Sequence, residues 1–153
     1  MPAPTSNGRT DTGLAVSLTT ATVVLVLITA YIHLSLGGAL FTLNALGYVA
    51  LTTALVASWI PHPFVRRFAW LPRVGLAGYT ALTIVAYLVM GPYFTLGWVA
   101  KGIEVAIIAL LAADLMRLYG SPAGLVRAAL ASLRVGSRPA EGAGLGEPDR
   151  VGG

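Results

Sequence analysis

A small set of polar side chains interrupts a chain that is otherwise strongly apolar. Lys101 and Glu104 lie three residues apart in the apolar segment 96–118, so they share one face of a predicted helix. A charge within a bilayer costs free energy and is usually retained for a specific role. The pair therefore indicates either a buried ligand or proton site, or a lysine that reaches the headgroups while it remains paired to the glutamate.

Three other apolar segments each contribute polar side chains. In the first, His33 ends a stripe of threonines. In the second, Asn44 and Tyr48 are four residues apart and share a helical face. In the third, Tyr87 follows two threonines at helical spacing. The predicted ligand-binding residues are His33, Asn44, Tyr48, Tyr87, Lys101 and Glu104.

The residue types of this set favour an amphiphile with hydrogen-bonding oxygens. Histidine, tyrosine, asparagine and lysine bind carbonyl or headgroup oxygens, while apolar helices surround a tail. A quinone fits this description, although no resident cofactor is predicted. A metal site is disfavoured, because Lys101 competes for Glu104 and no pair of metal ligands recurs at helical spacing. Two alternatives stay open: a proton-linked network, and a polar cluster that only fixes helix packing.

The composition places the chain among membrane proteins. Hydrophobic residues make up 56% and charged residues only 10% of its 153 residues, whereas soluble domains carry about 25% charged residues. The absence of cysteine excludes disulfides, thiolate metal sites and thiol redox chemistry. The predicted fold is an all-α membrane protein with one four-helix transmembrane bundle.

Helix-breaking residues divide the apolar sequence into four spans. Gly37-Gly38 supplies the first turn, the prolines at 61 and 63 end the second span, and Gly91-Pro92 separates the last two. The spans are predicted at about 14–36, 39–60, 74–90 and 95–118.

The flanking segments complete the expected organisation. Residues 1–13 are expected to form a flexible cytoplasmic lead to the transmembrane domain at 14–120. Ser121-Pro122 begins an amphipathic helix at about 122–135, expected to lie on the membrane surface within a segment 121–135. Residues 136–153 are rich in glycine, proline and charge and are expected to be disordered.

Arginine positions predict the orientation in the membrane. Four spans put the N-terminus, the connection 61–73 and the C-terminus on one side. Every arginine, including Arg73 at headgroup level, belongs to these regions or to the adjoining helix ends. Only Lys101 lies nearer the other side. By the positive-inside rule, both termini are expected to be cytoplasmic in the plasma (inner) membrane of a bacterium.

The six predicted ligand-binding residues are expected at similar depths in the membrane. At about 1.5 Å per residue, these side chains fall roughly 4–14 Å below the outer boundary. All four spans therefore contribute to one polar layer in the outer half of the membrane, and no comparable layer is expected in the inner half. Asp114 and Arg117 are expected to form an interfacial pair near the inner end.

A separate face of the last span carries small residues. Small side chains allow another helix to approach closely, either within the bundle or at a subunit contact. These predicted helix-packing residues are Gly102, Ala106, Ala109 and Ala113.

Three functions are compatible with these features. The first expectation is a non-enzymatic accessory or assembly subunit of a membrane complex, because no catalytic motif is present. The alternative is a binding or redox-linked protein that holds a quinone-like or lipid ligand in the outer layer, and a small transporter is the weakest. The expected partners are the lipid bilayer and either another membrane protein or a second copy. Nucleic acid is not expected, because the arginines are dispersed along membrane boundaries.

Overall fold

The computed structural model describes residues 7–134, with side chains from Asp11 onward. Four helices in this range are long and apolar enough to cross a membrane, and no strand occurs in it. The prediction of an all-α membrane protein with four spans is therefore confirmed. The helices in chain order are α1 (Asn7–Leu36), α2 (Ala39–Ala57), α3 (Pro63–Arg67), α4 (Trp70–Met90), α5 (Thr95–Tyr119) and α6 (Pro122–Leu133).

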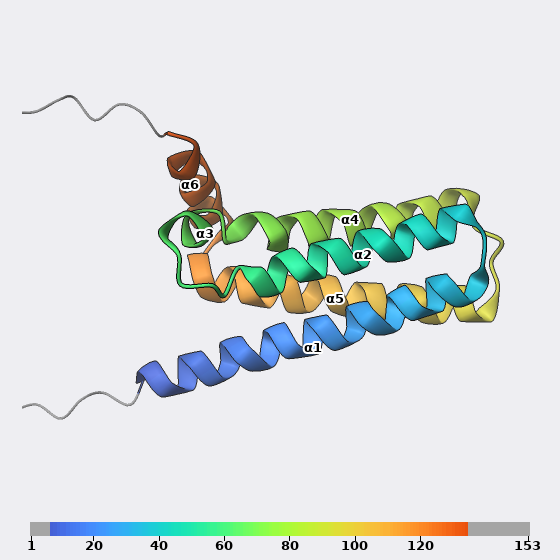
Figure 1. The fold of residues 1–153 in the computed structure, drawn as a ribbon, viewed down its shortest axis with the longest axis horizontal. Helices are drawn as coiled ribbons and strands as arrows, with labels where there is room; N and C mark the ends of the chain where they lie inside the picture. Colours follow the sequence, from blue (N-terminus) through green and yellow to red (C-terminus); the bar gives the residue numbers. More distant parts are fainter. Residues whose placement is uncertain (1–6, 135–153) are drawn as a thin grey trace, which may run out of the picture.

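The four long helices are connected as two hairpins that lie against each other (Figure 1). Helix α1 contacts α2 and α5, and α4 contacts the same two helices, so the contacts close into a ring. Helix α1 diverges from the others toward its first residues (Figure 1). Its 30 residues would extend about 45 Å, longer than the ~30 Å hydrocarbon core, and a tilt accommodates the excess.

The tight turns fall where the sequence predicted them. Gly37 and Gly38 have φ angles of 70° and 86°, a region that side chains with a Cβ avoid, and they connect α1 directly to α2. Helix α4 ends at Met90, immediately before Gly91-Pro92. These two turns define one end of the bundle, hereafter the hairpin end, and the opposite end carries α3 and α6 (Figure 1).

The predicted start of the first span and the predicted end of the second are both wrong. Helix α1 starts at Asn7 instead of about residue 14, because no proline interrupts residues 7–36 and a helix propagates readily once formed. Residues 7–13 are thus helical, not part of a flexible lead. Helix α2 ends at Ala57 instead of about residue 60, where the backbone tightens before the prolines and Ile60 N–H donates to Ala57 O at 3.0 Å. Residues 1–6, and the tail 135–153 that we expected to be disordered, lie outside the described residues.

The connection at 61–73 is more helical than expected. It contains α3, where the Phe64 amide donates to the His62 Nδ1 at 3.3 Å and the imidazole thereby caps the helix. It also contains the first turn of α4, which starts at Trp70 instead of about residue 74. Pro72 lies in that first turn, where an amide hydrogen would have no partner in the helix, so the proline does not interrupt it.

Helix α6 begins as predicted, with the Ser121 hydroxyl accepting a hydrogen bond from the Gly124 amide at 3.0 Å. Its far end is held against the connection through Ser132. Arg67 donates to the Ser132 carbonyl, from Nε at 2.7 Å and also from Nη2, and Trp70 Nε1 donates to the Ser132 hydroxyl at 3.2 Å. The sequence did not predict this attachment, which fixes α6 to the end of the bundle.

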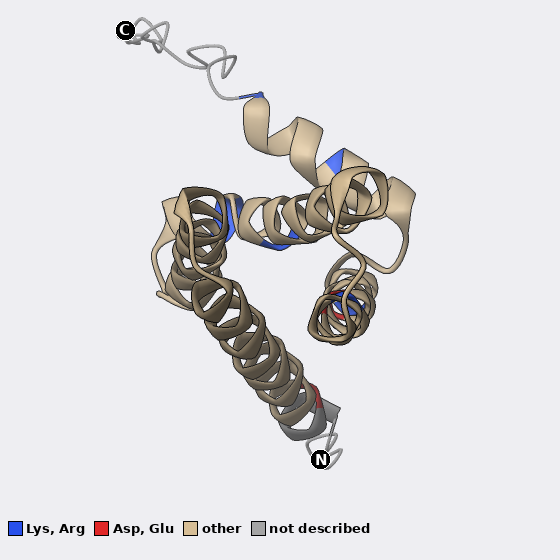
Figure 2. Ribbon diagram, turned by 90° about the vertical axis from the view of Figure 1, so that its right-hand side faces the viewer, with Lys and Arg blue, Asp and Glu red and all other residues tan. Residues whose placement is uncertain are grey.

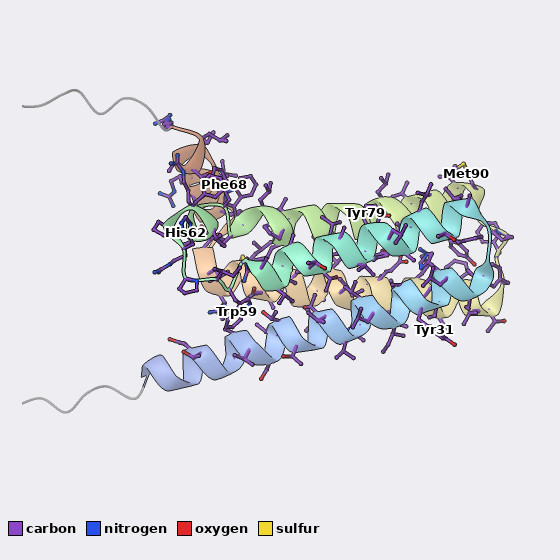
Figure 3. The ribbon with its side chains drawn as sticks, viewed as in Figure 1. Tyr31, Trp59, His62, Phe68, Tyr79 and Met90 are labelled. Atoms are coloured by element: carbon purple, nitrogen blue, oxygen red, sulfur yellow. The ribbon has the colours of Figure 1, made fainter. Side chains whose placement is uncertain are left out.

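A narrow core joins the four long helices, and larger apolar side chains cover the outside. Leu40, Val89 and Met90 are 75%, 73% and 77% exposed, and Met90 projects at the hairpin end (Figure 3). Most of the ribbon in Figure 2 is tan, because few residues of the long helices are charged. Such a surface is suited to lipid. The buried apolar cluster consists of Val26, Ala30, Ala45, Tyr48, Leu55, Leu76, Ile107 and Leu111.

Candidate functional site

Lys101 and Glu104 lie on the face of α5 that is directed into the bundle. Glu104 is fully buried and Lys101 is 7% exposed. Lys101 Nζ donates to Glu104 Oε2 at 2.6 Å and to the backbone carbonyl of Thr83 at 3.3 Å. The lysine is therefore held inside the protein and does not extend along the lipid-facing surface.

His33 approaches the same carboxylate from α1. Its Nδ1 pairs with the carbonyl of Thr29 at 2.7 Å, which leaves Nε2 3.8 Å from Glu104 Oε1. That distance is too long for a hydrogen bond. Among the described residues, Glu104 Oε1 has no hydrogen-bond partner although it is buried. A buried carboxylate oxygen without a partner is costly and calls for an explanation.

Thr83 on α4 connects the carboxylate to α2. Its hydroxyl lies 3.0 Å from Glu104 Oε2 and 2.9 Å from the hydroxyl of Tyr48, which is fully buried. All four long helices therefore meet around one carboxylate. We call His33, Tyr48, Thr83, Lys101 and Glu104 the Glu104 cluster.

Asn44 and Tyr87 lie beside the Glu104 cluster. Asn44 Oδ1 accepts a hydrogen bond at 2.7 Å from Tyr79, which projects from α4 on the side of α2 (Figure 3). The Tyr87 ring centroid is 5.4 Å from Lys101 Nζ, within the range of a cation–π contact. The structure thus brings all six predicted residues to one region. Only four of them, His33, Tyr48, Lys101 and Glu104, belong to the Glu104 cluster.

A cavity of about 350 Å³ adjoins the Glu104 cluster at the hairpin end. This volume is within the range of small-molecule sites, roughly 300–1,000 Å³. Most of its wall is apolar, from side chains of α2, α4 and the turn before α5. Its polar wall is formed by His33, Asn44, Tyr79, Thr83, Tyr87 and Lys101.

The absence of a side chain at Gly97 allows Tyr87 to form part of this wall. A Cβ at Gly97 would overlap the phenol of Tyr87. The Tyr87 hydroxyl donates to the Phe94 carbonyl at 3.3 Å, and its ring meets Trp98 edge-on with centroids 5.6 Å apart. The first turn of α5 therefore fixes the position of Tyr87 over the cavity.

A second buried polar group lies near the end that carries α6, where the sequence predicted none. Arg73 Nε donates to Asp114 Oδ2 at 2.7 Å, and Arg117 Nη2 donates to Oδ1 at 2.7 Å. Arg73 Nη1 also donates to the Ala69 carbonyl at 2.6 Å and the Ser58 hydroxyl at 3.2 Å. We call Ser58, Arg73, Asp114 and Arg117 the Asp114 cluster.

This finding corrects two expectations. Arg73 was expected at headgroup level in a loop, but α4 already includes it and its side chain is buried with Asp114. Asp114 does pair with Arg117 as expected, yet Asp114 is buried and not at an exposed boundary. The half of the bundle nearer α3 and α6 therefore has its own polar layer, which the sequence did not predict.

The small-residue face of α5 is directed away from the bundle. A Cβ added at Gly102 would meet no other atom within 4 Å. Within the residues whose side chains are described, this face packs against no other helix, so the expected contact inside the bundle is not found and a subunit contact stays a prediction. All four residues of the face are exposed: Gly102, Ala106, Ala109 and Ala113.

Thr83 and Tyr79 belong to the site but were absent from the predicted set. Tyr79, Thr83 and Tyr87 recur every four residues and so occupy one face of α4. That spacing was a usable signal, although threonine and tyrosine alone do not distinguish a site from ordinary helix packing.

Residues 7–134 contain no group of three or more His, Cys, Asp or Glu side chains that could hold a metal ion. Comparison with known proteins gives no relative: no protein-family model, curated protein or solved structure matches the chain. The geometry is therefore the basis for any functional argument. At the hairpin end it offers a largely apolar cavity whose lining includes polar side chains from all four long helices.

Proposed function

We propose that the protein binds a small amphiphile, quinone-like or lipid, in the cavity beside the Glu104 cluster. The observation that carries this proposal is a largely apolar cavity of about 350 Å³ whose lining includes polar side chains from four helices, among them the buried His33 and Lys101. Ligand sites combine these two features, because apolar walls bury the body of a ligand and a few polar groups orient its head.

The Glu104 cluster also has unused hydrogen-bonding capacity. The lysine ammonium has three N–H groups, and Lys101 uses two of them within the protein. Glu104 Oε1 has no partner among the described residues. A cluster that only fixed helix packing would be expected to satisfy its buried groups.

The proposed location is the plasma (inner) membrane of a bacterium, with several spans and both termini in the cytoplasm. Basic side chains support this orientation, since Arg66, Arg67, Arg117 and Arg127 all lie toward the end that carries α3 and α6. The cavity at the opposite end then falls within the outer leaflet, where an amphiphile is able to enter from the lipid.

Filling the cavity tests the proposal without changing a polar group. Ala86 lines the cavity, whereas Ala81 on the same helix is exposed and does not line it. Ala81→Phe is therefore the control. We expect native mass spectrometry to detect a bound amphiphile on the wild type and on Ala81→Phe, and none on Ala86→Phe. A wild-type protein that is empty after mild extraction, or an Ala86→Phe variant as fully loaded as the wild type, contradicts the proposal.

A second candidate function is an accessory or assembly subunit, which the exposed small-residue face of α5 favours. Gly102→Leu blocks close approach of a partner helix, and Gly78→Leu is its control, because Gly78 is exposed on α4 and also has open space around it. We expect cross-linking in membranes to capture a partner or second copy in the wild type and Gly78→Leu, but not in Gly102→Leu. Equal capture by all three proteins excludes this face as the contact.

A further inference from the structure

The hydrogen-bond donors in the cavity wall narrow the class of ligand. Asn44 accepts from Tyr79 through Oδ1, and its amide nitrogen makes no hydrogen bond within the described residues. Lys101 retains one N–H after its bonds to Glu104 and Thr83. Both residues line the cavity, so the wall offers spare donors to an oxygen acceptor.

The charge of the wall argues against an anionic head. The ammonium of Lys101 is matched by the Glu104 carboxylate at 2.6 Å, and no other Lys, Arg, Asp or Glu among residues 7–134 lines this cavity. A carboxylate or phosphate would therefore add a negative charge near Glu104 without a free cation to balance it. In a medium of low dielectric constant, this arrangement is unfavourable.

The aromatic side chains of the wall suit a flat ring. Phe41, Tyr79, Tyr87 and Phe94 all line the cavity. Aromatic side chains contact planar ligands through stacked or edge-to-face arrangements. Leu40 and Met90 also line the cavity and are highly exposed, so they would contact a tail that continues into the lipid.

We infer that the ligand is a neutral ring dicarbonyl, a quinone, whose carbonyl oxygens accept hydrogen bonds from Lys101 and Asn44. This inference rests on the proposed function and selects one ligand class within it. It assigns Asn44 and Lys101 the role of ligand-binding residues, and it assigns the aromatic wall the contact with the ring.

Equilibrium binding to the purified full-length protein tests the inference with three probes. They are a decyl-substituted benzoquinone, a decanoate anion and a lysophospholipid with a ten-carbon chain. We expect the Kd for the quinone to be at least about tenfold lower than for either anion or zwitterion, because two hydrogen bonds favour it and no charge opposes it.

Two variants test whether Asn44 and Lys101 donate hydrogen bonds to the quinone. Asn44→Leu is expected to raise the Kd for the quinone by about tenfold or more. The double variant Lys101→Met/Glu104→Gln is expected to do the same, and it leaves no unpaired buried charge that would prevent folding. Thr42→Val is the control, since Thr42 is exposed on the same helix as Asn44 and bonds only to Gly38 of its own turn.

The outcomes separate this inference from the proposed function. Decanoate or lysophospholipid binding as tightly as the quinone, with sensitivity to Ala86→Phe, overturns the quinone assignment and leaves the proposed function standing. Quinone binding that is unchanged in both donor variants also overturns the inference. Failure of every probe to bind overturns the proposed function together with the inference.

Discussion

The two buried polar clusters differ in how completely their carboxylates are satisfied. In the Asp114 cluster, one carboxylate oxygen accepts from Arg73 and the other accepts from Arg117, each at 2.7 Å. In the Glu104 cluster, Lys101 and Thr83 both donate to Oε2, while Oε1 has no partner among the described residues. The two acidic side chains lie on the same helix and are about equally buried, so burial alone does not distinguish them.

The two clusters also differ in whether a cavity lies beside them. The cavity of about 350 Å³ adjoins the Glu104 cluster, and no residue of the Asp114 cluster lines it. A second cavity of about 340 Å³ between α1 and α2 is lined by valines, threonines and Trp59, without a charged side chain. The satisfied Asp114 cluster, without a cavity, is what a packing role would require, whereas the unsatisfied Glu104 cluster beside a cavity supports the proposed binding role.

Removal of the negative charge from the Asp114 cluster should have the largest effect on stability. Asp114→Asn leaves Arg73 buried without a counter-charge, and loss of one partner of a buried pair costs about 3–5 kcal/mol. Reversible unfolding in mixed detergent micelles measures this loss. Arg117→Gln should cost much less, because the Arg117 side chain is 22% exposed and Asp114 retains Arg73. Equal losses in the two variants would remove the distinction between a buried core pair and a partly exposed one.

A methyl group at Gly97 should have an intermediate effect on stability and a large effect on ligand binding. The new Cβ overlaps the Tyr87 phenol, and such overpacking costs about 1–3 kcal/mol. Displacement of Tyr87 changes the cavity wall, so Gly97→Ala should lose the amphiphile that we expect native mass spectrometry to detect on the wild type. Gly102→Ala on the same helix adds its methyl group to open space and should retain both stability and ligand. Equal behaviour of the two variants would contradict the role of Tyr87 in the cavity wall.

Loss of one hydroxyl in the Glu104 cluster should have the smallest effect on stability. Thr83→Val removes hydrogen bonds to Tyr48 on α2 and Glu104 on α5, and interhelical bonds in membranes contribute about 0.6 kcal/mol each. The expected loss of free energy of unfolding is therefore about 1 kcal/mol. Thr53→Val should have no measurable effect, because Thr53 is exposed and bonds only to its own helix. A loss several times larger for Thr83→Val would show that the cluster mainly stabilises the fold.

The spans and most of the site could be predicted from the sequence, because both follow from local rules. Glycine and proline mark the turns, and helical periodicity combined with depth brings His33, Lys101 and Glu104 to one level. The Asp114 cluster could not be predicted in this way. Whether Arg73 lies at the surface or inside depends on α4 starting a turn earlier, a boundary that apolar composition does not define.

The sequence also could not predict whether the small-residue face of α5 is directed into the bundle or away from it. Small residues suit close helix contacts, but lipid is as apolar as another helix, so composition does not say which face of α5 is directed inward. The burial of Lys101 and Glu104 determines which face of α5 is directed into the bundle. Burying Lys101 and Glu104 places Gly102 and the alanines of that stripe on the outside.

Ligand-induced stabilisation, measured on both clusters, is the most direct test of their different roles. A decyl-substituted benzoquinone at about 100 times its Kd should raise the free energy of unfolding of the wild type by about 2.7 kcal/mol. We expect Arg117→Gln in the Asp114 cluster to keep this increment and the double variant Lys101→Met/Glu104→Gln to lose it. An increment that persists in the double variant, or that disappears equally in both, would contradict the assignment of binding to the Glu104 cluster.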